Sequence, residues 1–151
     1  MNVLLIIHAA ATLFMTGLIW FVQIVHYPLF GKVGRTEFSG YEAAHQRLTT
    51  YVVAPAMLLE LVTAGVLVFS GEPGMGRFIR VTNLVLLLLI WGITAGVQVP
   101  QHNSLNAGFD ETVWRKLVLG NWGRTILWSV RSGLVSLILW QQMQAAVPTE
   151  G

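Results

Sequence analysis

The sequence predicts an all-α integral membrane protein, a four-helix bundle made of two helical hairpins. Of its 151 residues, 54% are hydrophobic and only 11% are charged, and the mean hydropathy is +0.64. A soluble domain normally carries about 25% charged residues, so this chain has too few charges to cover a surface in water. The charges are also unevenly spread, since none occurs before Lys32 or between Val81 and Pro100.

Four apolar stretches are long enough to cross a bilayer, which takes roughly 20 helical residues. They cover residues 3–25, 51–69, 81–99 and 117–140. No basic residue precedes the first stretch and its apolar residues continue well past Ala9 to Ala11, so it is predicted to be a retained span rather than a secretory signal. The chain, 1–151, is therefore expected to form a single four-span transmembrane domain.

The connections between the spans differ in length and composition. Residues 70–76 are rich in glycine and contain Pro73, which predicts a tight turn between the second and third spans. Residues 36–50 carry apolar or aromatic side chains at spacings of three and four, including Phe38 and Leu48. This pattern predicts a short amphipathic helix that leads into the second span.

Basic residues near the span ends predict the orientation of the chain. The end with the two long connections carries six of them, and the opposite end carries only Arg77 and Arg80. The six are Lys32, Arg35, Arg47, Arg115, Lys116 and Arg124. Long loops 1 and 3 are therefore predicted to be cytoplasmic, with both termini on the opposite side. The formal net charge is only +2, so the expected partner is the lipid bilayer and not nucleic acid.

Polar side chains gather at one predicted end of the bundle. His26 ends the first span, His45 precedes the second and His102 ends the third, while Asn121 and Arg124 open the fourth. Ionisable groups in or beside membrane helices are candidates for a functional site. We therefore expect these side chains to share one site, although each histidine alone is also compatible with simple hydrogen bonds to loops and headgroups.

A metal is one prediction for this site. Glu42 and His45 form a Glu-x-x-His pair, whose spacing places both side chains on one face of a helix. With His26 and His102 they make a predicted ligand set for one Fe, Cu or Zn ion. The chain has no cysteine, so thiolate ligands and disulfides are excluded. His8 lies about 27 Å of helix away from His26 and is interpreted as structural.

Two opposite charges lie deeper in the predicted spans. Counting along regular helices places Glu60 and Arg131 near the middle of the membrane. An unpaired charge there costs several kcal/mol, so the two are expected to form an intramembrane ion pair. The pair is interpreted either as a clamp between the second and fourth spans or as part of a proton relay, with Thr94, Gln98 and His102 as a polar stripe along its path.

Three short motifs stand at the span ends: Tyr27-Pro28-Leu29 after the first span, Val99-Pro100-Gln101-His102-Asn103-Ser104-Leu105 after the third, and Asn121-Trp122-Gly123-Arg124-Thr125 at the entry to the fourth. Together they resemble the anthrone-oxygenase-like family of small four-helix membrane proteins. The chain departs from the family in having His102 where asparagine is usual, and in adding His26 and the pair Glu42/His45. The resemblance implies oxidation of a lipophilic, often aromatic, substrate by dioxygen at the membrane.

The residues allow a physical version of this reaction. His45 or His102 would act as the base, because an imidazole titrates near neutral pH. Arg124 and Asn121 would stabilise negative charge on an enolate or peroxide. The substrate pocket is predicted to include Tyr27, Gln98 and Trp128.

Two other functions remain open at this stage. A 16.7 kDa chain with short loops also fits a non-enzymatic subunit of a larger membrane complex, with a homo-oligomer or another membrane protein as its partner. Histidines on different helices can also ligate one haem, as in an electron carrier. The membrane oxidoreductase is the leading prediction, and these two functions are its alternatives.

Overall fold

The computed structural model describes residues 3–70 and 76–145. All regular secondary structure in these two ranges is helical. The elements join into four continuous rods. They are α1 (Val3–Phe21), η1 (Val22–His26) and α2 (Tyr27–Phe30); α3 (Phe38–Phe69); α4 (Arg77–Ile93), η2 (Thr94–Gln98) and α5 (Val99–Leu105); and α6 (Glu111–Ala145). Residues 71–75 of the predicted turn at 70–76 lie outside the described residues.

Three of the rods are long and apolar enough to cross a membrane. They are Val3–Phe30, Phe38–Phe69 and Arg77–Leu105. Each extends beyond the span predicted from the sequence, because the helix continues into polar residues at its end. The fourth predicted span, 117–140, lies inside α6, which contains Arg124 and Arg131 and is not among the three. Its passage through a membrane stays a prediction.

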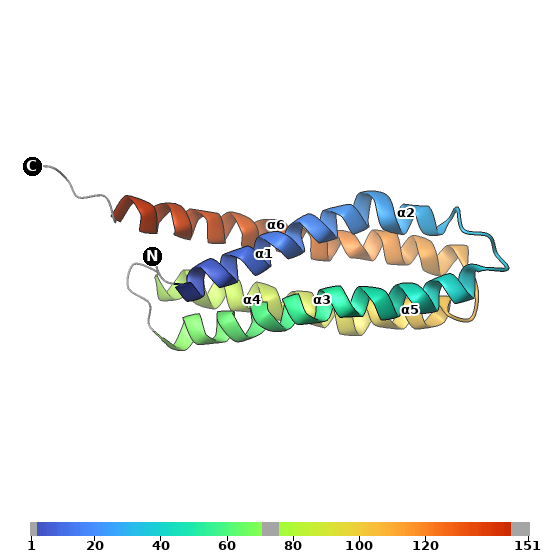
Figure 1. Ribbon diagram of the computed structural model, residues 1–151, viewed down its shortest axis with the longest axis horizontal. Coiled ribbons are helices and arrows are strands. Elements are labelled where there is room, and N and C mark those ends of the chain that lie inside the picture. The colour runs from blue at the N-terminus through green and yellow to red at the C-terminus, as the bar shows by residue number, and fades with distance from the viewer. Residues whose placement is uncertain (1–2, 71–75, 146–151) are drawn as a thin grey trace, which may run out of the picture.

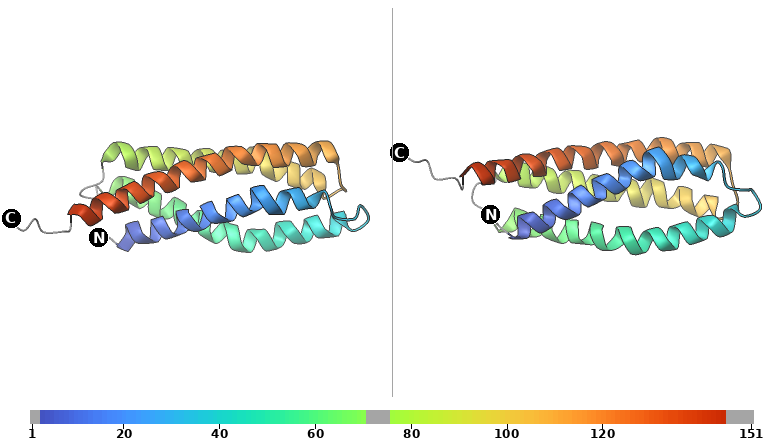
Figure 2. Two further views of the ribbon diagram at one scale, coloured as in Figure 1. Left: turned by 90° about the horizontal axis from the view of Figure 1, so that it is seen from above. Right: turned by 45° about the horizontal axis from the view of Figure 1, so that its top comes forward.

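Each rod packs against two neighbours that run in the opposite direction. α1 packs against α3 and α6, and α4 packs against the same two helices. The connections 31–37 and 106–110 lie at one end of the molecule, and the start of α1 and the end of α6 lie at the other (Figure 1). The two further views in Figure 2 show the same alternation of direction. The end that carries the two connections is called the loop end below.

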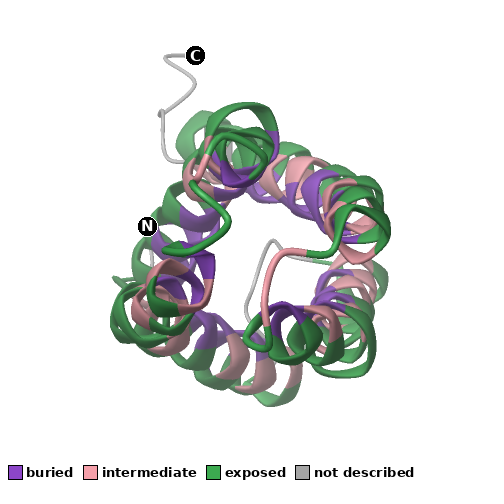
Figure 3. Ribbon diagram, turned by 90° about the vertical axis from the view of Figure 1, so that its right-hand side faces the viewer, coloured by how far each residue is buried: buried purple, intermediate pink, exposed green. Residues whose placement is uncertain are grey.

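The outer surface is far more apolar than that of a water-soluble protein, and several ionisable side chains are buried. Buried residues face the axis between the rods and exposed residues face outward (Figure 3). Large apolar side chains such as Phe14, Phe21 and Leu58 are exposed, whereas Glu60 and Arg131 are fully buried. This pattern suits an apolar surrounding, in which each ionisable side chain needs a partner inside the protein.

Two rods contain a π-helical turn at comparable positions. η1 ends two residues before Pro28, and η2 ends two residues before Pro100. In both, a backbone N–H bonds the carbonyl five residues earlier: Tyr27 to Val22, and Val99 to Thr94. A proline ring clashes with the carbonyl four residues before it, and the wider turn relieves this clash. Such turns often occur at functional sites.

The predicted amphipathic helix and the second span form a single helix, α3. It begins at Phe38 and runs without interruption through Pro55. Phe38, Glu42 and His45 lie on its buried face. Leu48, which the spacing placed on the apolar face of this segment, is 58% exposed. Its position suits contact with lipid instead of the protein interior.

Candidate functional site

A cavity of about 260 Å³ lies between the rods, nearer the loop end. Its apolar wall consists of Met15, Leu18, Ile19, Val22, Val53, Ala54, Met57, Trp91, Val99 and Trp128. Its polar lining consists of Tyr27, His45, Gln46, Thr49, Thr50, Thr94, Gln98, His102 and Arg124. An apolar cavity with a few convergent polar groups is typical of a site for a small lipophilic molecule.

A chain of hydrogen bonds leads from a buried carboxylate to the cavity. His102 Nδ1 lies 2.6 Å from Glu42 Oε1, and His102 Nε2 lies 2.8 Å from the Tyr27 hydroxyl. Glu42 is fully buried. A neutral imidazole has one donor and one acceptor nitrogen. With the Glu42 carboxylate accepting from Nδ1–H, Nε2 is the nitrogen that accepts from the Tyr27 O–H.

Arg124 is a buried cation at the polar end of the cavity. Its Nε and Nη2 donate to Asn121 Oδ1 over 2.9 and 2.6 Å, and Nη1 donates to Thr94 Oγ1 over 3.2 Å. Nη2 also lies 3.4 Å from the Tyr27 hydroxyl. Arg124 is 7% exposed, and no carboxylate of the described residues pairs with it. A buried charge without a counter-ion is costly, so a negatively charged group beside Arg124 would be stabilised.

Asn121 holds this arginine in place. Its Nδ2 donates to Gln23 Oε1 over 2.9 Å, and Gln23 Nε2 donates to the carbonyl of Val118. Asn121 therefore presents its oxygen to Arg124 in a fixed orientation. It lies behind the arginine and does not line the cavity.

Three histidines from three rods meet beside this centre. A 2.8 Å hydrogen bond joins His26 Nε2 to His45 Nδ1, and the ring centroids of His45 and His102 lie 5.1 Å apart. The ring of Phe30 packs against His26 and His45 at 5.2 and 5.0 Å. His45 and His102 line the cavity, whereas His26 lies behind His45.

The geometry gives the predicted metal no support. Glu42 bonds His102 and His26 bonds His45, so these groups face one another and not a common centre. Within residues 3–70 and 76–145, no group of three or more histidine or carboxylate side chains is arranged to hold a metal ion. Ligation by His26, Glu42, His45 and His102 stays a prediction.

Two buried polar atoms in the cavity wall lack a hydrogen-bond partner within the described chain. They are Gln98 Oε1, an acceptor, and Trp91 Nε1, a donor. Gln98 is only 1% exposed, and its Nε2 reaches the carbonyl of Leu117 at 3.5 Å. An unpaired buried polar atom costs about 1–3 kcal/mol.

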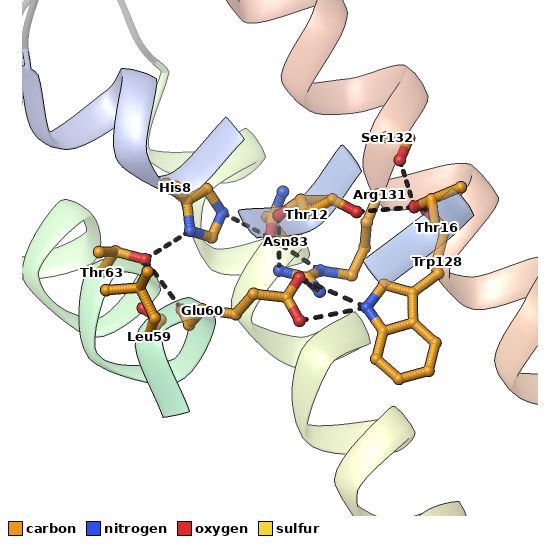
Figure 4. A network of polar contacts seen from close by, with 10 residues as sticks. All are labelled: His8, Thr12, Thr16, Leu59, Glu60, Thr63, Asn83, Trp128, Arg131 and Ser132. Atoms are coloured by element: carbon orange, nitrogen blue, oxygen red, sulfur yellow. Dashed lines mark hydrogen bonds and ion pairs between the residues drawn. The ribbon is translucent and has the colours of Figure 1, made fainter. Parts of the chain in front are cut away.

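Glu60 and Arg131 lie in contact deeper in the molecule, where the sequence predicted an ion pair. Arg131 Nη1 donates to Glu60 Oε1 over 2.5 Å, and Trp128 Nε1 donates to Glu60 Oε2 over 3.2 Å. Arg131 Nε donates to Asn83 Oδ1 over 3.1 Å. Figure 4 shows these side chains converging from three rods. We call this group the ion-pair network.

His8 belongs to the same network and not to the histidine cluster. Its Nδ1 lies 2.8 Å from Thr63 Oγ1 and its Nε2 lies 3.4 Å from Asn83 Oδ1 (Figure 4). Its ring therefore links the first rod to α3 and α4. This position agrees with the structural role interpreted from the sequence.

The structure brings most of the predicted site residues together. The cavity lining includes Tyr27, His45, Gln98, His102, Arg124 and Trp128. His26, Glu42 and Asn121 support that lining from behind. Gln23 and Phe30 also position the site, and sequence reasoning did not assign them a role. Gln23 had a detectable signal, because it is a polar side chain inside an apolar span.

Comparisons with known proteins add nothing to this description. The chain matches no protein-family model, no curated protein and no solved structure. The resemblance to the anthrone-oxygenase-like family therefore stays a hypothesis. The function is argued from the cavity and its side chains.

Proposed function

We propose that all four rods cross the bilayer as a four-helix bundle of two hairpins, with the loop end cytoplasmic and both termini opposite. The outward face of α6 supports the fourth span. Arg124 and Arg131 are buried, and the exposed residues of this helix include Leu119, Ile126 and Val130. The two charges inside the predicted span 117–140 thus face the protein interior, where they have polar partners.

We further propose that the protein is a membrane enzyme that deprotonates a lipophilic molecule and oxidises it with dioxygen. The observation that carries the proposal is the Glu42–His102–Tyr27 chain, which reaches an apolar cavity next to an unpaired cation. The proposal is supported by a hydrogen-bonded histidine and a buried arginine at the same end of one cavity, which would act as proton acceptor and stabilising charge. Both are needed to form an enolate from a weak carbon acid.

In the proposed reaction the Tyr27 oxygen takes the proton from a CH₂ group of the substrate while the hydroxyl proton passes to His102 Nε2. The Glu42 carboxylate stabilises the resulting imidazolium. Arg124, 3.4 Å from the Tyr27 oxygen, stabilises the enolate. Dioxygen then oxidises this carbon: one oxygen atom ends in the new carbonyl group and the other in water, so that CH₂ and O₂ give C=O and H₂O.

The shape of the cavity supports a largely apolar substrate. Trp91 and Trp128 supply aromatic wall, and Met15 and Met57 close the deeper part. Methionine and aromatic side chains pack well against flat ring systems. The family resemblance implies the same class, a lipophilic and often aromatic molecule.

Dioxygen uptake by the purified protein in liposomes tests the proposal. The substrates would be fused-ring aromatic ketones with a CH₂ group between the rings. We expect uptake that His102→Ala lowers at least 100-fold, since a general base contributes about 10²–10⁴-fold. His8→Gln, a histidine outside the cavity, is the matched control and should retain activity. Equal uptake by wild type and His102→Ala would contradict the proposed mechanism.

The alternatives give different results with the same preparation. A stoichiometric partner that co-purifies, with no uptake by the protein alone, would favour the accessory subunit. About one Fe, Cu or Zn ion per chain in elemental analysis would support the predicted metal. A haem would be visible in the absorption spectrum.

A further inference from the structure

The cavity opens sideways between α3 and the third rod. α3 packs against α4 and α5 but not closely against η2, the π-helical turn between them. Two exposed residues line the cavity: Thr50 on α3 and Val99 at the start of α5. The lining residues of α1 are buried or half-buried. The cavity therefore communicates with the outer surface at this gap, which would face lipid in a membrane.

A shallow hollow lies on the outer surface at the same place. It is lined by Ala43, Gln46, Arg47, Thr50, Tyr51 and Asn106. Gln46 and Thr50 line both the hollow and the cavity, so they form the threshold between the two. The hollow and the gap together are called the side opening below.

Arg47 gives the side opening a positive charge. Its side chain is exposed, and it forms no ion pair or hydrogen bond within the described residues. The nearest acidic side chain along α3, Glu42, is fully buried and bonds His102. A guanidinium binds a planar carboxylate through two parallel hydrogen bonds. The free Arg47 therefore fits an acidic group that reaches the hollow from outside.

We propose that the side opening admits a lipophilic carboxylic acid from the bilayer, with its carboxylate on Arg47 and its apolar body in the cavity. This inference rests on the proposed function, because the body would lie against Tyr27 and His102. Along α3 the lining runs from His45 to Met57, about 18 Å of helix, which accommodates an elongated body. Arg47 then binds the carboxylate at the membrane interface, while Arg124 stabilises the negative charge that forms at the reacting carbon.

Equilibrium binding tests the charge recognition. The probe is a brominated 16-carbon carboxylic acid, compared with its methyl ester, in phosphatidylcholine nanodiscs. Binding is read as the saturable part of tryptophan quenching, since Trp91 and Trp128 line the cavity. We expect the acid to bind at least 10-fold more tightly than the ester, and Arg47→Gln to reduce this ratio to below 2.

Lys116→Gln is the matched control for bulk charge. It removes one positive charge from an exposed residue at the same end of the molecule, outside the cavity and the hollow. We expect it to keep the preference for the acid. An equal affinity of wild type for acid and ester would overturn the proposal, as would an equal loss in the Arg47 and Lys116 variants.

Blocking the gap tests the route. The chain has no cysteine, so Thr50→Cys provides a unique thiol for a bulky maleimide. We expect the labelled variant to take up the acid at least 10-fold more slowly than the unlabelled variant. Leu48 is exposed on the same helix but lies outside the cavity and the hollow. In Leu48→Cys the label should therefore leave the rate of acid uptake unchanged. Uptake at the wild-type rate by labelled Thr50→Cys would refute entry through this gap.

These measurements separate the two proposals. Binding is recorded without turnover, so a His102→Ala protein that binds the acid but consumes no dioxygen would support both. Normal dioxygen uptake by Arg47→Gln with unchanged acid binding would leave the enzyme intact and reject the side opening. Acid binding that depends on Arg47, without any dioxygen uptake, would support the side opening and reject the enzyme.

Discussion

Two buried arginines on α6 occupy opposite environments. Arg131 donates to the carboxylate of Glu60 and to the amide oxygen of Asn83. Arg124 donates only to neutral oxygens, those of Asn121, Thr94 and Tyr27. The first arginine lies in the ion-pair network, where its charge is compensated (Figure 4). The second faces the cavity with its charge uncompensated.

The difference separates a structural charge from a functional one. A buried ion pair with additional hydrogen bonds fixes the helices that carry it. A buried cation held by neutral groups is instead oriented in advance for negative charge that forms later. Burial alone does not distinguish the two arginines, since Arg124 is 7% exposed and Arg131 is 0% exposed. Their partners do.

The largest effect is expected when the ion-pair network is broken. Glu60→Gln leaves Arg131 buried without a counter-ion, which costs about 3–5 kcal/mol. We expect this variant to unfold at a markedly lower temperature in detergent. The double variant Glu60→Leu/Arg131→Met removes both charges and should recover most of the stability. A single variant as stable as wild type would show that the pair is not a clamp.

Loss of the uncompensated arginine is expected to affect activity and not stability. Arg124→Gln removes the stabilisation of the enolate, and the loss of one such donor lowers rates by about 10²–10³-fold. Dioxygen uptake measures this effect. The midpoint of thermal unfolding should change much less than in Glu60→Gln, because no partner carboxylate is left unpaired. A comparable fall in unfolding temperature would abolish the distinction between the two arginines.

Removal of the Tyr27 hydroxyl interrupts the proton path. Tyr27→Phe keeps the ring that packs on Phe30 and His102 but removes the donor to His102 Nε2. We expect dioxygen uptake to fall by about 10²-fold, with normal equilibrium binding of the probe acid. The matched control is Tyr41→Phe, since no hydrogen bond from the hydroxyl of Tyr41 is found within the described chain. Retained uptake in Tyr27→Phe would mean that a histidine, His45 or His102, takes the proton directly.

The smallest effect is expected at the contact between α6 and Gln98. A Cβ added at Gly120 would lie 3.1 Å from Gln98 Nε2, so Gly120→Ala displaces this amide by a few tenths of an ångström. We expect a change of a few-fold in affinity for the probe acid and an unfolding midpoint near that of wild type. Gly133→Ala is the control on the same helix, because open space surrounds that position. Equal affinities in both variants would remove Gln98 from the site.

The sequence predicts the depth of each polar residue along its helix better than it predicts the hydrogen-bond partners of that residue. A helix rises 1.5 Å per residue, so counting along the chain places His26, His45 and His102 at one depth, and the structure joins them through rings and hydrogen bonds. The same counting puts Glu60 beside Arg131. Depth along a helix follows from the number of residues alone, because the rise per residue is constant.

Partners depend on rotation about each helix axis, which the sequence does not fix. Glu42 was grouped with His45 because the two lie three residues apart, yet Glu42 bonds His102 from another rod. Leu48 has the spacing of the buried face but is exposed. The π-helical turns alter the rotation further, and no local sequence rule locates them apart from the prolines that follow.

Those π-helical turns have a consequence for tolerance to change in length. Deleting one residue from a regular α-helix turns everything beyond it by about 100°. A π-helical turn already holds one residue more than an α-helical turn, so a deletion within Val22–His26 converts it to a regular turn while Tyr27 keeps its direction. Thr94–Gln98 offers the same allowance in the third rod. Each of these rods thus contains one stretch where the loss of a single residue leaves the residues on either side aligned.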